Sequence, residues 1–251
     1  MNRVLAHTGA RYPIVQAPMG WIARTQLASA VSRAGGLGII ETSSGETEAC
    51  QVEIDQMKAL KLPFGVNLPI CFLRDDAMLK FVCNSGVKFV TTSAGSPAKF
   101  IAPLKDAGIV VYHAVPTVET ALKCVEAGVD GLVVEGAEGG GFKNPEEVST
   151  LVLLQGIRAV LNKKSTPCIR ALKSERTRTI YDAGLMAPGA LKGIRHLYFE
   201  GDMEAAPALA GQSAGLIDAI KPARDIIEET VAQFFTITTR LGGLASARGF
   251  G

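Results

Sequence analysis

The stretch that decides the fold is VDGLVVEGAEGGGFKNP, residues 129–145. Its first part, Val129–Glu135, is mostly apolar and β-branched, which predicts a buried strand that ends in a carboxylate. The next loop holds three consecutive glycines, Gly139, Gly140 and Gly141. A backbone without Cβ atoms can approach a flat or anionic ligand closely. A lone glycine triplet is equally compatible with a surface turn, so the other strand ends have to be compared.

Similar apolar runs recur along the first half of the chain. They begin at Pro13, Leu37, Pro63, Val87, Ile109 and Val129. Between them lie segments with helical patterns, most of which stop at a glycine: 25–34, 46–60, 74–85, 97–107, 117–127 and 145–155. Five strand–helix units followed by a sixth strand predict a parallel sheet. The near-equal length of the units favours a barrel over a doubly wound sheet.

We therefore predict an α/β fold with a TIM-barrel-like (β/α) repeat of six recognisable strands in residues 1–155. Residues 156–251 contain no convincing pair of further strands and are interpreted as a mostly helical C-terminal segment. Its expected helices are 170–183, 203–220 and 222–241. Because a complete barrel needs eight strands in about 250 residues, we expect this barrel to be incomplete.

The charge and the cysteine content of the chain limit the classes of function and partner that are expected. The net charge is +2 without a basic block, so no nucleic acid or anionic membrane is expected as a partner. The five cysteines are scattered, which argues against a zinc site or a disulfide framework and for a reducing cytoplasm. We see no signal peptide and no transmembrane span. A small-molecule substrate is the expected partner.

The expected carboxyl ends of the strands carry small and polar residues. They are Ala17, Met19, Gly20, Glu41, Asn67, His113 and Glu135. Ligands of parallel barrels bind at this end of the sheet. The set suits a large planar cofactor, and its acidic residues and histidine are too sparse for a metal. For His113, a hydrogen-bonded core histidine is favoured over a functional group.

Five motifs follow one another along the chain: QAPMG (16–20), AVSRAGGLG (30–38), PFGVNLP (63–69), TTSAGSP (91–97) and VVEGAEGGGFKNPEEVSTLVLL (133–154). In this order they resemble the nitronate monooxygenase (2-nitropropane dioxygenase) family, whose relatives include the flavin-dependent enoyl-ACP reductases. The resemblance runs over residues 11–155 and resumes at 161–177 and 201–226. It implies a barrel that binds FMN.

The resemblance also implies which residues face the cofactor: Ala17, Met19, Gly20, Asn67, Glu135, Gly139, Gly140 and Gly141. The turn of Ala17, Met19 and Gly20 would pack on the isoalloxazine ring. Asn67 would form a hydrogen bond with the flavin, and the glycines would lie beside the ring. From the residues alone, core packing for Met19 and a turn or cap for Asn67 are the commoner readings.

Two departures from the family pattern bear on the chemistry. Many members carry a histidine directly after the glycines as the base that removes a proton from a nitroalkane, whereas this chain has Phe142. Phenylalanine cannot transfer a proton, and a nitronate, which is already an anion, needs no base. The glycine-rich loops that hold the FMN phosphate in the family are not recognisable in residues 156–251.

The leading hypothesis is an FMN-dependent oxidoreductase that oxidises alkyl nitronates with molecular oxygen, with no assigned catalytic residue beyond the weak candidate His113. The first alternative is an NAD(P)H-dependent flavin or enoyl-thioester reductase. The second is a non-catalytic truncated relative that has lost the FMN phosphate site. The sequence leaves a homodimer open.

Overall fold

The computed structural model describes residues 2–140, 148–161, 168–169, 199–200 and 217–247. Its strands are β1 (Gly38–Ile40), β2 (Phe64–Pro69), β3 (Phe89–Ser93), β4 (Val110–Val115), β5 (Gly131–Val134) and β6 (Cys168–Ile169). Its helices are α1 (Arg3–Thr8), α2 (Thr25–Arg33), α3 (Thr47–Ala59), α4 (Ala77–Ser85), α5 (Ala98–Asp106), α6 (Val118–Glu126), α7 (Thr150–Val160) and α10 (Ala223–Ala247), with a 3₁₀ turn at Ile70–Phe72.

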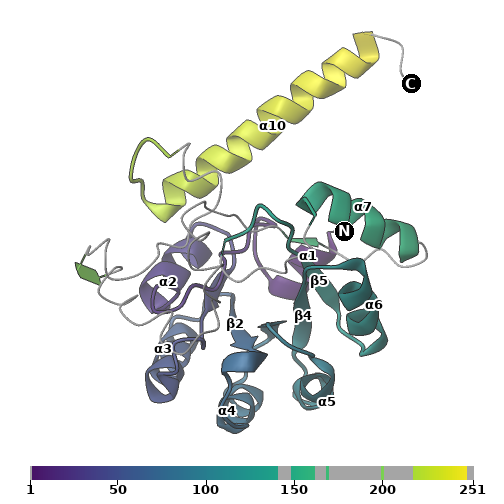
Figure 1. Cartoon of the computed structure of the whole chain (residues 1–251). Coiled ribbons are helices and arrows are strands. Elements are labelled where there is room, and N and C mark those ends of the chain that lie inside the picture. Colours follow the sequence, from purple (N-terminus) through teal and green to yellow (C-terminus); the bar gives the residue numbers. More distant parts are fainter. Residues whose placement is uncertain (1, 141–147, 162–167, 170–198, 201–216, 248–251) are drawn as a thin grey trace.

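The strands form one parallel sheet in the order β1-β2-β3-β4-β5-β6. Helices α2 to α6 fan around one side of it (Figure 1), so each crossover returns to the neighbouring strand as in a barrel. This confirms the TIM-barrel-like α/β class. The first expected strand is reduced to a bridge between Val15 and Leu37, because Pro18 lacks the N–H that would continue the ladder to Ile39 O, and the Gln16 side chain bonds the Ile39 backbone instead.

Alternation along the strands separates two apolar layers. Outward residues such as Val66, Val90 and Val111 pack against α2–α5 in the larger core cluster. The opposite face, here called the inner face, carries Phe89 and Tyr112. Helix α1 covers the amino ends of the strands, where His7 Nδ1 lies 3.0 Å from the Tyr112 hydroxyl.

Two glycines make room for the rings of the inner face. A Cβ on Gly131 would lie 2.5 Å from the Tyr112 ring, and one on Gly65 would lie 2.9 Å from Phe89. The two rings themselves pack with centroids 4.9 Å apart. The large aromatic residues therefore fill the inner face toward the amino ends of the strands. Smaller polar side chains line it at the carboxyl ends.

The segment after residue 155 departs from expectation in several places. Strand β6 pairs with β5 and adds a parallel strand that the apolar-run pattern does not predict. Helix α7 begins at Thr150 instead of Pro145, and residues 217–220, expected to be helical, are not. Residues 170–183 and most of 203–220 lie outside the described residues. The division at residue 155 stays a prediction.

Helix α10 confirms the expected helix near 222–241 and extends beyond it. Its first part packs on α2, where Ile227 is buried close to Gly36. The remainder projects away from the sheet (Figure 1) and exposes Phe234 and Phe235. In the described part of the chain, no helix is long and apolar enough to cross a membrane.

Candidate active site

Asn67 is the most deeply buried polar group near the carboxyl ends that also lies on the inner face. It sits on β2 between Val66 and Leu68, which both point outward into the larger core, and it is 3% exposed. The parallel register places it opposite Thr91 of β3. Strand alternation thus directs the Asn67 amide toward the inner face at the level where barrel enzymes bind ligands.

The oxygen of the Asn67 amide has stronger hydrogen-bond partners than its nitrogen. Its Oδ1 accepts hydrogen bonds from Thr91 Oγ1 at 3.0 Å and from Ser93 Oγ at 3.4 Å. Its Nδ2, which carries two N–H donors, has among the described residues a single contact, to Ser93 Oγ at 3.5 Å. Buried donors normally have partners, so this group has capacity to bind an acceptor.

The turn that contains Ala17, Met19 and Gly20 lies exposed at the same end of the sheet. Gln16 positions the start of the turn: its side chain accepts from Ile39 N and donates to Ile39 O, both at 3.2 Å. The turn closes where Ile22 N and Ala23 N donate to Met19 O. Met19 is 37% exposed, so its side chain is available for contact with a ligand and is not core packing.

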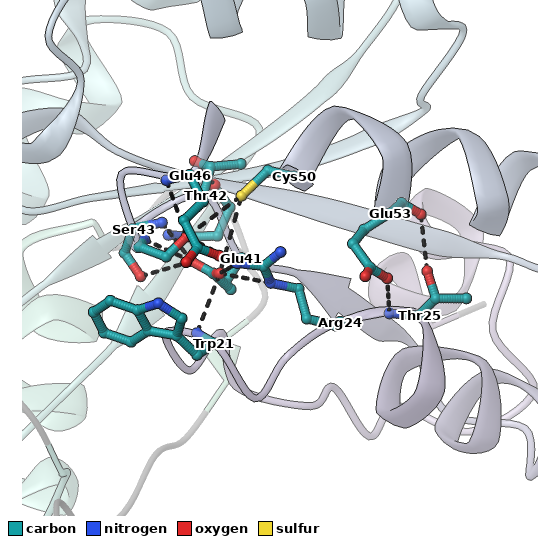
Figure 2. Close-up of polar contacts among 11 residues, drawn as sticks. Trp21, Arg24, Thr25, Glu41, Thr42, Ser43, Glu46, Cys50 and Glu53 are labelled. Carbon is teal, nitrogen blue, oxygen red and sulfur yellow. Dashed lines mark hydrogen bonds and ion pairs between the residues drawn. The ribbon is translucent and has the colours of Figure 1, made fainter. Parts of the chain in front are cut away.

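A buried carboxylate, Glu41, joins this turn to the end of β1. Figure 2 shows it surrounded by Trp21, Arg24 and Ser43. Its side chain is fully buried, and Arg24 Nη2 lies 2.8 Å from Oε1. Cys50 lies beside the pair, and burial, with the Glu41 charge next, raises the pKa of its thiol to about 11. That thiol is therefore protonated at neutral pH and is a poor nucleophile.

Glu135 and the glycine-bearing loop follow β5. Glu135 is half-buried, and its N–H donates to Val115 O at 3.1 Å. The loop then packs tightly on α7, because a Cβ on Gly136 would lie 2.2 Å from Thr150 N. Glu138 Oε2 accepts from Thr150 N at 2.8 Å and from Thr150 Oγ1 at 2.7 Å. Glu138 thus caps the amino end of α7 and anchors the loop.

Gly139 and Gly140 continue this anchored loop, with Gly139 N donating to Gly136 O. Gly141 and Phe142 lie outside the described residues. The sequence pattern places Glu41 at a strand end but indicates no partner for it, and it indicates no role for Arg24 or Glu138. Each is a charged residue near the end of a strand or at a helix start, and such a position does not indicate which group the side chain will bind.

His113 lies apart from these residues. It follows Tyr112 on β4, so alternation turns it toward the helix side of the sheet, away from Asn67. It is 1% exposed, and its Nδ1 lies 2.7 Å from Thr92 Oγ1. Burial lowers its pKa to about 4. The described residues contain no group of three or more His, Cys, Asp or Glu that could hold a metal ion.

Comparison with known proteins matches these features to one family. The family model described as nitronate monooxygenase matches residues 2–78 and 71–171. The chain belongs to the nitronate monooxygenase family. The match covers the exposed turn, Asn67 and the loop after β5, so it includes the whole carboxyl-end site.

Two named proteins are similar to this chain in sequence. The chain is 32% identical over 164 residues to (3aS,4S,5R,7aS)-5-hydroxy-7a-methyl-1-oxo-octahydro-1H-indene-4-carboxyl-CoA dehydrogenase of Mycobacterium tuberculosis, covering 65% of this chain and 46% of that protein. It is 28% identical over 176 residues to nitronate monooxygenase of Paraburkholderia phytofirmans, covering 54% and 48%. The chain thus spans about half the length of these curated relatives.

Solved structures agree with the fold. FabK from Thermotoga maritima superposes with a TM-score of 0.81 at 27% identity, covering 96% of this chain and 98% of that chain. A nitroalkane oxidase from Streptomyces ansochromogenes gives a TM-score of 0.59 at 26% identity, covering 66% and 59%. The arrangement of strands and helices is therefore shared with these two proteins.

Proposed function

We propose that this chain is an oxidoreductase that holds a flavin, FMN, at the carboxyl ends of its strands. The observation that carries the proposal is the Asn67 amide, which is buried, directed to the inner face and short of an acceptor. A flavin ring offers hydrogen-bond acceptors along one edge and a flat face, and the exposed turn of Ala17, Met19 and Gly20 lies at the same end of the sheet.

The residues present fit such a group. Asn67 would donate to the ring, and Met19 and Gly20 would pack on its face. Glu135 and the loop of Gly139 and Gly140 would border it. The loop is suited to this because Glu138 fixes it on α7, so a bound ring would meet a preformed surface. When bound, the flavin supplies the electron-transfer chemistry, and the protein supplies position and electrostatics.

We propose alkyl nitronates as the substrate and molecular oxygen as the oxidant, so that the nitronate is oxidised and oxygen is reduced. Phe142 stands where a base is found in many members, and His113 packs on the other face of the sheet with a low pKa. A substrate that arrives as an anion fits a site without a base. The backbone N–H of Gly140 would help to orient it, because the N–H of Gly139 is bonded to Gly136 O.

The first test is the visible spectrum of the purified protein, with parallel titrations of FMN and riboflavin followed by flavin fluorescence. We expect a bound-flavin spectrum and consumption of a nitronate together with oxygen. Tighter binding of FMN than of riboflavin would show that the chain holds the phosphate. Equal affinity would show that the ring contacts alone retain the cofactor. A colourless protein that binds neither would overturn the proposal and favour the non-catalytic relative.

A reductase is the second candidate function. It is supported by the 32% identity to a dehydrogenase whose name places its action on a CoA thioester. Anaerobic addition of NADPH separates the two: rapid bleaching of the flavin favours an NAD(P)H-dependent reductase, whereas bleaching by a nitronate alone favours the monooxygenase.

We also propose a cytoplasmic protein. Cys50, Cys71, Cys83 and Cys124 are free thiols, which supports a reducing compartment. A homodimer stays a prediction, and light scattering at several concentrations would test it.

A further inference from the structure

We infer that Glu41 and Arg24 are positioning residues that hold the turn of Met19, Gly20 and Trp21 in the shape needed to contact the cofactor. The inference rests on the proposed function for its link to flavin binding. Neither residue touches the ring in this proposal. They act through the backbone of the turn.

The Glu41 carboxylate is surrounded by donors. Oε1 accepts from Trp21 N at 3.2 Å and from Arg24 Nε at 2.9 Å. Oε2 accepts from Ser43 N at 2.6 Å, Ser43 Oγ at 3.0 Å and Ser44 N at 3.0 Å. A carboxylate has about four lone-pair sites, so both oxygens are saturated. A buried charge persists only with such partners, which makes the arrangement specific to an ionised carboxylate.

One of these donors belongs to a strained residue. Trp21 has a φ of +62°, a left-handed conformation that is unfavourable for a bulky side chain. Strained residues persist where the surroundings fix them, and they gather at ligand-binding sites. Here the fixing contact is the bond from Trp21 N to Glu41, at the turn that exposes Met19 (Figure 2). The strain is thus held at the proposed cofactor contact.

Arg24 extends the same network to the loop after β1. Its Nη2 donates to Ser44 Oγ at 2.9 Å and to Glu46 Oε2 at 3.2 Å. A backbone hydrogen bond from Glu41 N to Ala23 O, 3.0 Å long, joins the same two segments. Loops 19–24 and 41–46 are therefore joined into one unit, and the turn cannot move without breaking several hydrogen bonds.

The chain offers a matched control, Glu53 on α3. Its Oε2 accepts from Thr25 N at 2.8 Å, and its carbonyl accepts from Thr25 Oγ1 at 3.0 Å. Glu53 thus secures the start of α2, one residue after Arg24, without contacting the turn (Figure 2). Glu53→Gln changes a half-buried carboxylate that bonds a backbone N–H next to Arg24 and leaves the contacts of the turn intact, so it shows what the loss of a nearby carboxylate does without loss of positioning.

The experiment compares Glu41→Gln with Glu53→Gln. All the Glu41 partners are donors, so an amide NH₂ in place of either oxygen would face an N–H or O–H group. Trp21 is the sole tryptophan of the chain, so its fluorescence reports on the turn. We expect Glu41→Gln to increase acrylamide quenching of Trp21 about twofold or more and to weaken FMN binding about tenfold, as for a lost charged hydrogen bond. Glu53→Gln should leave both readouts near wild type.

Glu41→Asp guards against failure of the Gln variant to fold. It retains the charge but is one methylene shorter, so it cannot reach Trp21 N and the Ser43 and Ser44 amides together, and it should show the same changes to a smaller extent. Equal effects of the Glu41 and Glu53 variants, or none from Glu41→Gln, would overturn the inference. If wild type binds no FMN, the proposed function fails, and the quenching of Trp21 still decides the positioning role.

Discussion

The buried histidine predicts a specific pH dependence of stability. Burial lowers the pKa of His113 from 6.5 to about 4, so the unfolded chain takes up this proton at a higher pH than the folded chain. Stability is then unaffected well above pH 6.5 and falls as the pH drops from 6.5 toward 4. At about 1.36 kcal/mol per pKa unit, the full loss is about 3 kcal/mol, and about 2 kcal/mol is lost by pH 5.

The assay is urea unfolding followed by far-UV circular dichroism between pH 8 and pH 4, for wild type and His113→Asn. Asparagine can retain a hydrogen bond to Thr92 Oγ1, which lies 2.7 Å from His113 Nδ1, and it does not titrate in this range. All other titrating groups are shared, so they cancel in the difference between the two curves. Thr92→Val is the control, because it removes the hydroxyl and leaves the histidine to titrate.

We expect the difference in unfolding free energy between wild type and His113→Asn to be constant above pH 7 and to change by about 2 kcal/mol by pH 5. Thr92→Val should be less stable than wild type at every pH and keep the wild-type pH slope. Parallel curves for wild type and His113→Asn down to pH 4 would refute the reasoning, because they would mean that His113 takes up its proton equally in the folded and unfolded chains.

Three further predictions concern the loop after β5 and the Asn67 amide. Gly136→Ala should lower the unfolding free energy by about 3 kcal/mol, because its Cβ would lie 2.2 Å from Thr150 N. Gly86→Ala is the control, because a Cβ there would meet nothing within 4 Å and only the φ of +81° disfavours it; it should lower the unfolding free energy by about 1 kcal/mol. Equal losses for the two variants in urea unfolding would contradict the packing argument. Glu138→Gln should cost about 1 kcal/mol by the same assay, since a charged cap of α7 is replaced by a neutral one; unchanged stability would count against the cap. Asn67→Ala should weaken FMN about tenfold in a fluorescence titration, whereas Ser96→Ala, at an exposed serine of the same end, should not; equal affinities would remove Asn67 from the site.

Much of the fold follows from local signals that are strong in this chain. The runs that form β1 to β5 are apolar on both faces, because helices cover one side and aromatic rings fill the other. The first run forms only a single bridge at Val15, since Pro18 has no N–H to continue the ladder. Strand β6 has two residues, which is too few for any periodicity to be visible. Its existence depends on pairing with β5, a contact that local sequence does not encode.

The start of α7 illustrates the same limit. Pro145 suits the first turn of a helix, so the pattern favours a start there. The structure begins the helix at Thr150, with Ser149 as the N-cap and Glu138 bonded to the first N–H. The second partner lies on another loop, and the sequence does not show which carboxylate will reach a given helix end.

The residues of the candidate site also differ in how far the sequence predicts their contacts. The sequence places Asn67 among the polar residues near the carboxyl ends of the strands, and the family resemblance predicts its contact with the flavin; the structure shows that its amide faces the inner side of the sheet. Glu41 and Glu138 occupy equally conspicuous positions, yet each acts on a backbone elsewhere in the chain: Trp21 N for the first and Thr150 N for the second. In both cases a carboxylate accepts from a backbone N–H of another segment, and this bond holds the loop beside the site in place. The sequence can therefore propose which side chains would touch the cofactor, whereas the residues that shape the surroundings of the site are identified only when their partners are brought together in space.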